Sequence, residues 1–224
     1  MKGIPLFLNK RKYELLLFAL LQHLFIGIVL TNLPKYTLYI WPVNMVLLGV
    51  ASVGIFAGKG RWKTSLRTGL FVLVLAGPLS LPFVQAKTTF MFFISAAYIV
   101  FFVFIFWEVM LFLLRPGYIN TDIISAAACG YLLLIEISTF LFQVLFYNNP
   151  LSFKGIDASG PAATYIDLVY FSSITLTSIG FGDILPGIHY TKLLTSLLGI
   201  AGQFYTVVLV GVLISKFSSK TNAH

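Results

Sequence analysis

Long runs of apolar residues without charge are the feature that most limits how this chain can fold. Four uncharged stretches cover residues 15–34, 36–58, 68–86 and 88–107. A fifth stretch, at 123–146, has Glu136 as its single charged residue, and a sixth covers 193–215. A helix needs about 20 apolar residues to cross the hydrocarbon layer of a bilayer. Because 58% of the residues are hydrophobic and only 10% are charged, the bilayer is the main solvent of this chain. We predict an all-α integral membrane protein with six transmembrane helices.

The residues that flank the first and fourth stretches indicate where the corresponding helices begin and end. Three basic residues at 10–12 precede the first stretch, an arrangement that also begins secretory signal peptides. The run is longer than a signal core, and no small-x-small cleavage site follows it before Tyr36, so we expect a retained helix. The fourth stretch continues through 108–114, and a cation, a proline and a glycine at 115–117 end it.

The basic residues predict the orientation of the chain. With six spans, both termini share one side, and that side receives 11 of the 15 basic residues: Lys2, Lys10, Arg11, Lys12, Lys59, Arg61, Lys63, Arg67, Arg115, Lys216 and Lys220. The other side receives Lys35, Lys87, Lys154 and Lys192. Basic residues concentrate on the cytoplasmic side, so we predict that both termini are cytoplasmic. The net charge of +8 forms no continuous patch with interleaved aromatics, and nucleic acid is not expected as a partner.

Between the fifth and sixth spans the sequence changes character. Residues 147–164 are rich in Asn, Pro, Gly and Ser, which is typical of a solvated loop. Pro161 suits the first turn of a helix, and the apolar residues 162–177 follow as about four helical turns. That length is too short to cross the membrane. We therefore predict a re-entrant helix that enters from outside and turns back.

The seven residues Thr-Ser-Ile-Gly-Phe-Gly-Asp at 177–183 follow this short helix. Non-helical backbone at membrane depth is tolerated only where it is packed in protein or lines water. A ring of inward-pointing carbonyl oxygens can replace the hydration shell of a potassium ion, and such a backbone needs dihedral angles that glycine adopts easily. Gly180 and Gly182 alternate as this requires, and Ser178 adds a hydroxyl oxygen. The negative C-terminal end of the short helix favours a cation there.

The stretch YFSSITLTSIGFGD at 170–183 resembles the pore helix and selectivity filter of tetrameric potassium channels, whose filter usually reads Thr-Val-Gly-Tyr-Gly-Asp. With the helices before and after it, the resemblance covers about residues 122–220. It implies a potassium-selective channel subunit and not an enzyme, with K⁺ as the transported ion and no other cofactor. The filter that it implies consists of Ser178, Ile179, Gly180, Phe181 and Gly182, supported by Thr177, Asp183 and Tyr170.

The resemblance also implies a central cavity and an assembly. Gly202 occupies the place of the family's inner-helix hinge glycine, and the cavity-facing residues would be Gln203, Thr206, Val210 and Ile214, which lie on one helical stripe. One chain supplies one filter strand, and in the family four strands make the pore. We therefore expect a homotetramer surrounded by membrane lipids, in the plasma membrane of a prokaryote.

Two residues depart from the usual filter. Phe181 replaces the more common tyrosine, so the phenol hydroxyl that anchors the filter to the pore helix is absent. Because this side chain points away from the ions in the family, we expect altered filter stability and retained selectivity. Ser178 replaces threonine and keeps the oxygen of the innermost site. We expect the hydroxyl of Tyr170 to hydrogen-bond the carboxylate of Asp183 behind the filter.

The remainder of the chain divides around this pore. We predict a cytoplasmic N-terminus at 1–12, a four-helix peripheral membrane domain at 13–118, a pore domain at 119–220 and a cytoplasmic tail at 221–224. Voltage-gated relatives carry arginine at every third position of the fourth helix. Residues 88–114 contain no Lys or Arg, so gating by such a sensor is not expected. The basic residues from 59 to 67 are interpreted as a cytoplasmic loop that fixes topology or contacts anionic lipid.

Two carboxylates and one histidine lie inside predicted spans, where ionisable groups are costly. Glu108 is about two helical turns from Arg115 and is interpreted as a residue of the cytoplasmic interface. Glu136 lies deeper and has no evident basic partner, so we expect it to be protonated or hydrogen-bonded to Ser, Thr or Tyr on another helix. A gating or proton-sensing role for Glu136 stays open. His23 is expected to be packed and hydrogen-bonded, because no second His or Cys stands at metal-ligand spacing.

Three alternatives to a potassium channel were weighed. A weakly selective cation channel is one alternative, and reversal potentials measured in potassium and in sodium gradients would distinguish it from a potassium-selective channel. A potassium transporter subunit usually places four pore-loop repeats in one chain, whereas this sequence has one, and subunit number separates the two. For an enzyme we find no metal cluster, nucleophile constellation or phosphate-binding loop in the sequence. The gating stimulus stays undetermined.

Overall fold

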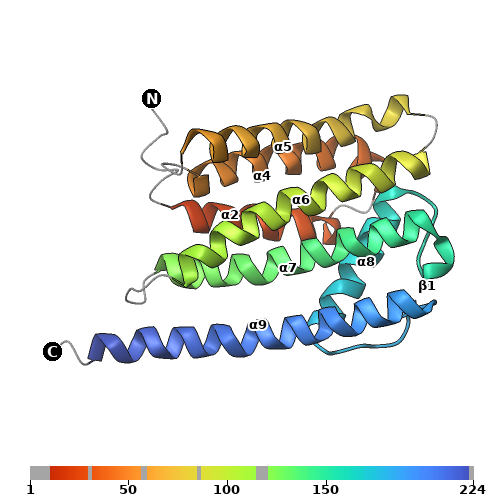
Figure 1. The fold of residues 1–224 in the computed structure, drawn as a ribbon. Helices are drawn as coiled ribbons and strands as arrows, with labels where there is room; N and C mark the ends of the chain where they lie inside the picture. The colour runs from red at the N-terminus through yellow and green to blue at the C-terminus, as the bar shows by residue number, and fades with distance from the viewer. Residues whose placement is uncertain (1–10, 30–31, 57–59, 85–86, 115–120, 222–224) are drawn as a thin grey trace.

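The computed structural model describes residues 11–29, 32–56, 60–84, 87–114 and 121–221, most of which are helical. The long helices are α2 (Lys12–Phe25), α4 (Trp41–Phe56), α5 (Arg61–Ser80), α6 (Lys87–Leu113), α7 (Thr121–Asn148), α8 (Pro161–Leu176) and α9 (His189–Thr221). Shorter helical segments are η1 (Ile26–Ile28), α3 (Leu33–Lys35), η2 (Tyr36–Ile40), η3 (Leu81–Phe83) and η4 (Pro150–Ser152). The long helices lie side by side, with α4 and α5 at one edge, α9 at the other and α8 between α7 and α9 (Figure 1). The predicted all-helical class of fold is confirmed.

Within the described residues, five helical stretches are long and apolar enough to cross a bilayer. They are Tyr36–Phe56, Arg61–Phe83, Lys87–Leu113, Thr121–Asn148 and His189–Leu209, and each coincides with a predicted span. The predicted first span corresponds to α2 and η1, which end at Ile28; of its remaining residues, 30 and 31 lie outside the described part. A sixth span therefore stays a prediction. The start of α2 and the end of α9 lie at the same end of the bundle (Figure 1).

Several predicted boundaries fall on residues that the structure does not describe. The predicted N-terminal segment 1–12 is described only at Arg11 and Lys12, and the predicted tail 221–224 only at Thr221. The predicted boundary between the peripheral and pore domains, at 118 and 119, lies within the undescribed residues 115–120. The division into domains stays a prediction.

Three of the four basic residues predicted to lie in a loop before the third span lie in a helix instead, so the prediction was wrong for Arg61, Lys63 and Arg67; Lys59 lies outside the described residues. Helix α5 begins at Arg61, so Arg61, Lys63 and Arg67 are helical. Arg67 is buried and donates to the carbonyl oxygen of Gly49 on α4 at 3.2 Å. Lys63 donates to the fully buried carboxylate of Glu108 on α6. Because both cations find acceptors on neighbouring helices, a helix that begins with basic residues can pack inside the bundle.

A small antiparallel ladder lies where the sequence predicted only loop. Strand β1 (Phe153–Lys154) pairs with strand β2 (Leu185–Pro186). The carbonyl oxygen of Ser152 accepts from Gly187 N at 2.7 Å and from Thr191 Oγ1 at 2.9 Å. These bonds tie the loop that follows α7 to the segment that leads into α9.

A proline in the third span creates a hydrogen-bonding problem that another helix solves. Pro78 lies inside α5 and has no N–H to donate to the carbonyl oxygen of Val74, four residues earlier. The buried hydroxyl of Tyr98 on α6 donates to that oxygen at 2.9 Å. An unpaired carbonyl would be costly in a membrane, so this bond allows Pro78 to sit within a spanning helix.

A set of packed aromatic rings connects the peripheral helices to α8. The ring centroids of Tyr98 and Phe140 are 4.6 Å apart, and those of Phe102 and Phe140 are 5.7 Å apart, which joins α6 to α7. Phe140 and Tyr165 then join α7 to α8 with centroids 5.8 Å apart. All four rings are buried. The first helices of the chain thus form one packed unit with the short helix.

We predict that Tyr98→Phe destabilises the protein because it leaves the oxygen of Val74 without a donor. The expected loss is about 1 kcal/mol, as for other hydrogen bonds between membrane helices. Thermal unfolding of the purified protein measures it. In a Pro78→Ala background, residue 78 supplies its own N–H, and the same Tyr98→Phe change should then cost less. Equal losses in both backgrounds would contradict this account.

Candidate functional site

The short helix α8 carries the segment that the sequence singled out. It runs from Pro161, at its first turn, to Leu176 and has 16 residues, so it is about 24 Å long and shorter than the hydrocarbon layer. It packs against α7 on one side and α9 on the other. Its predicted extent is confirmed to within one residue.

The backbone leaves the helical conformation directly after α8, and its first N–H groups turn back toward the helix. Ser178 N donates to Thr175 O at 3.0 Å, while Ile179 N and Gly180 N both donate to Ile174 O, at 2.9 and 3.2 Å. The last carbonyls of α8 therefore accept from the segment that follows it. This C-terminal cap fixes where the segment starts.

Residues 178–182 alternate between two backbone conformations. The φ angle is +58° at Ser178, +56° at Gly180 and +83° at Gly182, whereas Ile179 and Phe181 are not in this left-handed region. In a regular extended strand, successive carbonyls point to opposite sides. A backbone in which left-handed residues alternate with right-handed ones can instead turn successive carbonyls toward the same side. Glycine adopts this region freely, whereas Ser178 holds it at a cost of about 1 kcal/mol.

The carbonyl oxygens of residues 178–182 accept no hydrogen bond from any described part of the chain. All five residues are exposed in the single subunit. Peptide oxygens without a donor need water or a cation as a partner. The segment therefore presents a row of free oxygen ligands on the surface of one subunit.

The predicted bond between Tyr170 and Asp183 is present. The Tyr170 hydroxyl donates to Asp183 Oδ2 at 2.7 Å, and Ile184 N donates to Oδ1 at 3.0 Å. The hydrogen bond from Tyr170 holds the pKa of the Asp183 carboxyl below its usual range. The Phe181 ring lies nearly parallel to that of Tyr170, with an interplanar angle of 3° and centroids 6.4 Å apart. Both contacts brace the outer end of residues 178–182 against α8.

Helix α9 contacts the inner end of the segment. Gln203 Nε2 donates to Ser178 Oγ at 3.0 Å. Gly202 is buried, and a Cβ there would lie 2.5 Å from Leu176 O and 2.9 Å from Leu176 Cα. A glycine at this place lets α9 approach the end of α8, a packing role in addition to the predicted hinge role.

The other predicted site residues are only partly described. Thr206 is exposed and donates to Gly202 O at 3.0 Å, and Thr177 donates from Oγ1 to Ser173 O at 2.7 Å. Val210 and Ile214 lie on α9, but their side chains lie outside the described part. Their role in lining a cavity stays a prediction.

One face of α9 is apolar and uncovered in the single subunit. Its exposed side chains recur at alternating intervals of four and three: Leu193, Leu197, Ile200, Phe204 and Val207, each more than 60% exposed. Such spacing forms a continuous seam along a helix. Ser178 and Gln203 lie in a surface hollow of about 460 Å³ that Ile200, Phe204 and Val207 also line. Ser178, at the start of the segment, and part of the apolar seam therefore lie on the same side of the subunit.

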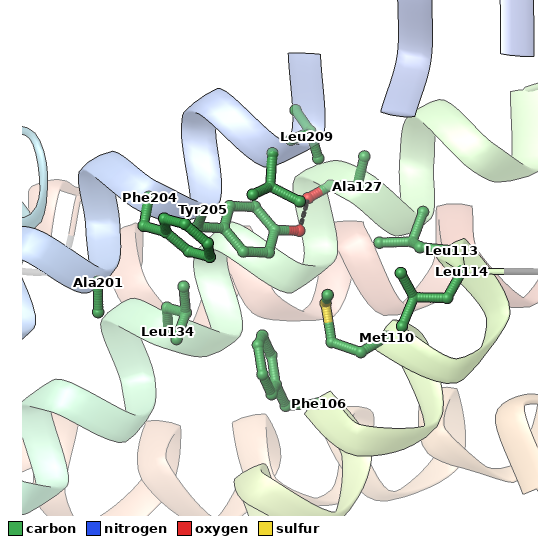
Figure 2. Close-up of a pocket in the computed structure, with 11 residues that line it drawn as sticks. Phe106, Met110, Leu113, Leu114, Ala127, Leu134, Ala201, Phe204, Tyr205 and Leu209 are labelled. Carbon is green, nitrogen blue, oxygen red and sulfur yellow. Dashed lines mark hydrogen bonds between the residues drawn. The ribbon is translucent and has the colours of Figure 1, made fainter. Parts of the chain in front are cut away.

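Behind this face, residues of α6, α7 and α9 line an apolar cavity of about 270 Å³. Figure 2 shows Tyr205 crossing from α9 toward α7 beside Phe106 and Met110 of α6. Its hydroxyl donates to Ala127 O at 2.8 Å. Gly130 on α7 makes room for this hydroxyl, because a Cβ at position 130 would overlap Tyr205 Oη.

The structure also brings together residues that the sequence analysis kept apart. His23 on α2 contacts Glu136 on α7, with 2.5 Å between Nδ1 and Oε1. Tyr165 on α8 reaches both groups. The prediction that Glu136 bonds a hydroxyl on another helix is confirmed, whereas the statement that it lacks a basic partner was wrong. Glu136 and His23 are 113 positions apart, and no local spacing signals such a pair.

We predict that Tyr170→Phe weakens the support of the outer end of residues 178–182. Without the hydroxyl donor, the pKa of the Asp183 carboxyl should rise toward its usual range, and the titration of Asp183 by NMR measures the shift. In the unaltered protein the lowered pKa keeps the carboxylate ionised, so the bond should persist at neutral pH and be lost only as the pH falls below about 4. An unchanged titration in Tyr170→Phe would contradict the role of this bond.

We predict that Gly130→Ala destabilises the contact of α7 with α9 by about 1–3 kcal/mol, because the added methyl overlaps the Tyr205 hydroxyl. Thermal unfolding measures the loss. Removing that oxygen with Tyr205→Phe should recover part of the stability in the double variant. If Gly130→Ala costs the same with and without the hydroxyl, the overlap is not the cause.

Comparison with known proteins agrees with this geometry. A family model described as "Ion channel" matches residues 130–219. No curated protein matches the chain, and no solved structure matches it. The matched residues include most of α7, all of α8, the segment at 177–183 and nearly all of α9. Over residues 130–219, the chain is therefore similar to the family described as "Ion channel".

Proposed function

We propose that this chain is the subunit of a homotetrameric potassium-selective channel, which conducts K⁺ passively across a membrane. In this proposal, residues 178–182 form the selectivity filter. Four copies of the segment surround one axis, and their carbonyl oxygens replace the water around a potassium ion. The Ser178 hydroxyl supplies the innermost oxygen. The ion-channel family match supports the general function, and the following features support the finer assignment.

The observation that carries the proposal is the row of carbonyl oxygens without donors at residues 178–182. In a membrane protein, such oxygens are tolerated when they face water or an ion. The positive φ angles at positions 178, 180 and 182 support the inference that the oxygens share a common direction. A row of parallel carbonyls is a ligand set for a dehydrated monovalent cation.

The electrostatics of α8 support a cation at the inner end of the segment. The C-terminus of a helix carries a partial negative charge, and α8 ends at Leu176, directly before the segment. Gln203 and Ser178 add polar groups there. Residues 177–183 and 199–207 contain no Lys or Arg that would repel a bound cation.

Assembly is supported by the surface of α9. Its apolar seam at positions 193, 197, 200, 204 and 207 is uncovered in one subunit, and Ser178 lies in the same surface hollow as three of these residues. Packing of identical subunits around an axis would cover parts of this seam and bring the oxygens together. Four subunits, rather than another number, follow from the resemblance of the filter sequence.

The same proposal includes an orientation in which both termini are cytoplasmic and the loop between α7 and α8 is outside, in the plasma membrane of a prokaryote. It rests on the distribution of basic residues, and the common end of α2 and α9 supports it. Voltage gating by arginines of α6 is not part of the proposal, because that helix contains no arginine.

The test is ion flux through the purified protein in liposomes. The reversal potential should follow the potassium gradient and respond little to sodium. A reversal potential that treats both ions alike would contradict selectivity and favour a weakly selective cation channel. The mass of the assembly in detergent should equal four chains. A monomeric mass would contradict the tetramer.

Two glycine substitutions sharpen this test. A Cβ at Gly180 and a Cβ at Gly69 both meet open space in the subunit, but Gly180 has a φ of +56° and Gly69 is helical. We predict that Gly180→Ala abolishes selective potassium flux, because alanine disfavours the left-handed conformation. Gly69→Ala should leave the flux unchanged. Wild-type selectivity in Gly180→Ala would overturn the assignment of this segment as the filter.

A further inference from the structure

A buried polar cluster joins three helices some distance from residues 178–182. Its members are His23 on α2, Glu136 on α7 and Tyr165 on α8, each less than one tenth exposed. His23 Nδ1 lies 2.5 Å from Glu136 Oε1 and 3.0 Å from the Tyr165 hydroxyl oxygen, and that hydroxyl donates to Glu136 Oε2 at 3.3 Å. These three side chains are called the buried triad below.

The surroundings of the buried triad contain no further formal charge in the described structure. The titratable groups that face Glu136 from other elements are Tyr36 on η2 and Tyr98 on α6. The remaining walls include the rings of Phe102 and Phe140. Any net charge on the triad would therefore stand uncompensated in an apolar interior, which costs far more than a paired charge.

Proton counting limits the state of the buried triad. It is neutral when imidazolium faces carboxylate, and also when imidazole faces a protonated carboxyl. The two forms differ only in the position of one proton between Nδ1 and Oε1. Adding a proton leaves a buried cation, and removing one leaves a buried anion. The packed arrangement of α2, α7 and α8 is therefore stabilised while the pair holds this one shared proton.

Two neighbouring hollows lie between the side of the α7–α8 loop and the buried triad. A surface hollow of about 400 Å³ includes Thr37, Pro161 and Ala162 in its wall. The same three residues line a cavity of about 10 Å³ that also contacts Gln143 and Tyr165. That volume is close to the space of a single water molecule, and the buried Gln143 Oε1 has no partner among the described residues.

We propose that His23, Glu136 and Tyr165 are positioning residues for α8, which hold it in place through one shared proton and make potassium conduction sensitive to pH on the side of the α7–α8 loop. The inference rests on the proposed channel function. Tyr165 lies in the first two turns of α8, and residues 178–182 begin directly after its other end. A helix transmits a displacement along its length. Loss of the neutral pair would therefore move the C-terminal end of α8, which holds residues 178–182 in place.

The two partners predict opposite pH responses when one is removed. In Glu136→Gln, protonated His23 has no counter-charge, so acid should destabilise the protein. In His23→Gln, ionised Glu136 has no counter-charge, so alkali should destabilise it. In Glu136→Gln, the folded-to-unfolded ratio should fall by about tenfold or more between about pH 8 and pH 5, where histidine changes charge. In His23→Gln, the ratio should instead fall as the pH rises, because an unpaired carboxylate is then buried.

The double variant His23→Gln/Glu136→Gln places two neutral amides that can hydrogen-bond where the ion pair stood. It should recover stability and show a flat pH profile, in both thermal unfolding of the full chain and potassium flux. The matched control is His189→Gln, which removes an exposed histidine at the start of α9 and should keep the wild-type pH profile. External and internal pH are varied separately in liposomes, and the wild-type flux should respond to the pH on the side of the α7–α8 loop.

The outcomes separate this inference from the channel function. If both single variants keep the wild-type profile, or the double variant keeps the wild-type pH response, the proposal is overturned. If the single variants do not fold, recovery of folded protein in the double variant supports it, and failure of the double variant beside a folded His189→Gln protein overturns it. Opposite unfolding profiles without any potassium flux would support the triad and contradict the channel function. Selective potassium flux with a flat wild-type pH profile would support the channel function and contradict the proposed role of the triad.

Discussion

A peptide oxygen inside a membrane protein must meet a donor, a water molecule or an ion, because an unpaired carbonyl in an apolar setting is costly. Residues 178–182 hold a row of such oxygens, and the surrounding structure maintains it. Helix α8 accepts the N–H groups of the segment, Tyr170 holds Asp183 at its outer end, and Gly202 lets α9 approach its inner end. The pairing of β1 with β2 fixes the segment that connects residues 178–182 to α9.

The helices before α7 are linked to this arrangement by buried groups. A row of packed aromatic rings runs from Tyr98 through Phe140 to Tyr165, and His23 contacts Glu136 beside it. The hydroxyl of Tyr98 also supplies the bond that Pro78 cannot. The first part of the chain therefore packs against α8 itself. In this account it acts as a support for the pore, since α6 lacks the arginines of a voltage sensor.

Apolar run length predicted six spanning helices, of which five are found within the described residues, and the turn after α8 was predicted from its glycines. The Tyr170–Asp183 bond was also predicted, because the partners are close in sequence and the family pattern places them together. Arg67 was misplaced because a sequence of basic residues looks like a loop until its acceptors on α4 are known. The His23–Glu136 pair was missed because it joins helices more than one hundred positions apart. The left-handed conformation of Ser178 was missed because serine gives no signal for it.

The central claim is that four copies of residues 178–182 turn their free oxygens toward one axis and bind potassium there. An electron cryo-microscopy map of the protein in lipid with potassium tests it most directly. The account predicts fourfold symmetry and a row of ion density on the axis, within coordination distance of these oxygens and altered when sodium replaces potassium. Oxygens turned away from a symmetry axis, or an axis without ion density beside them, would contradict it.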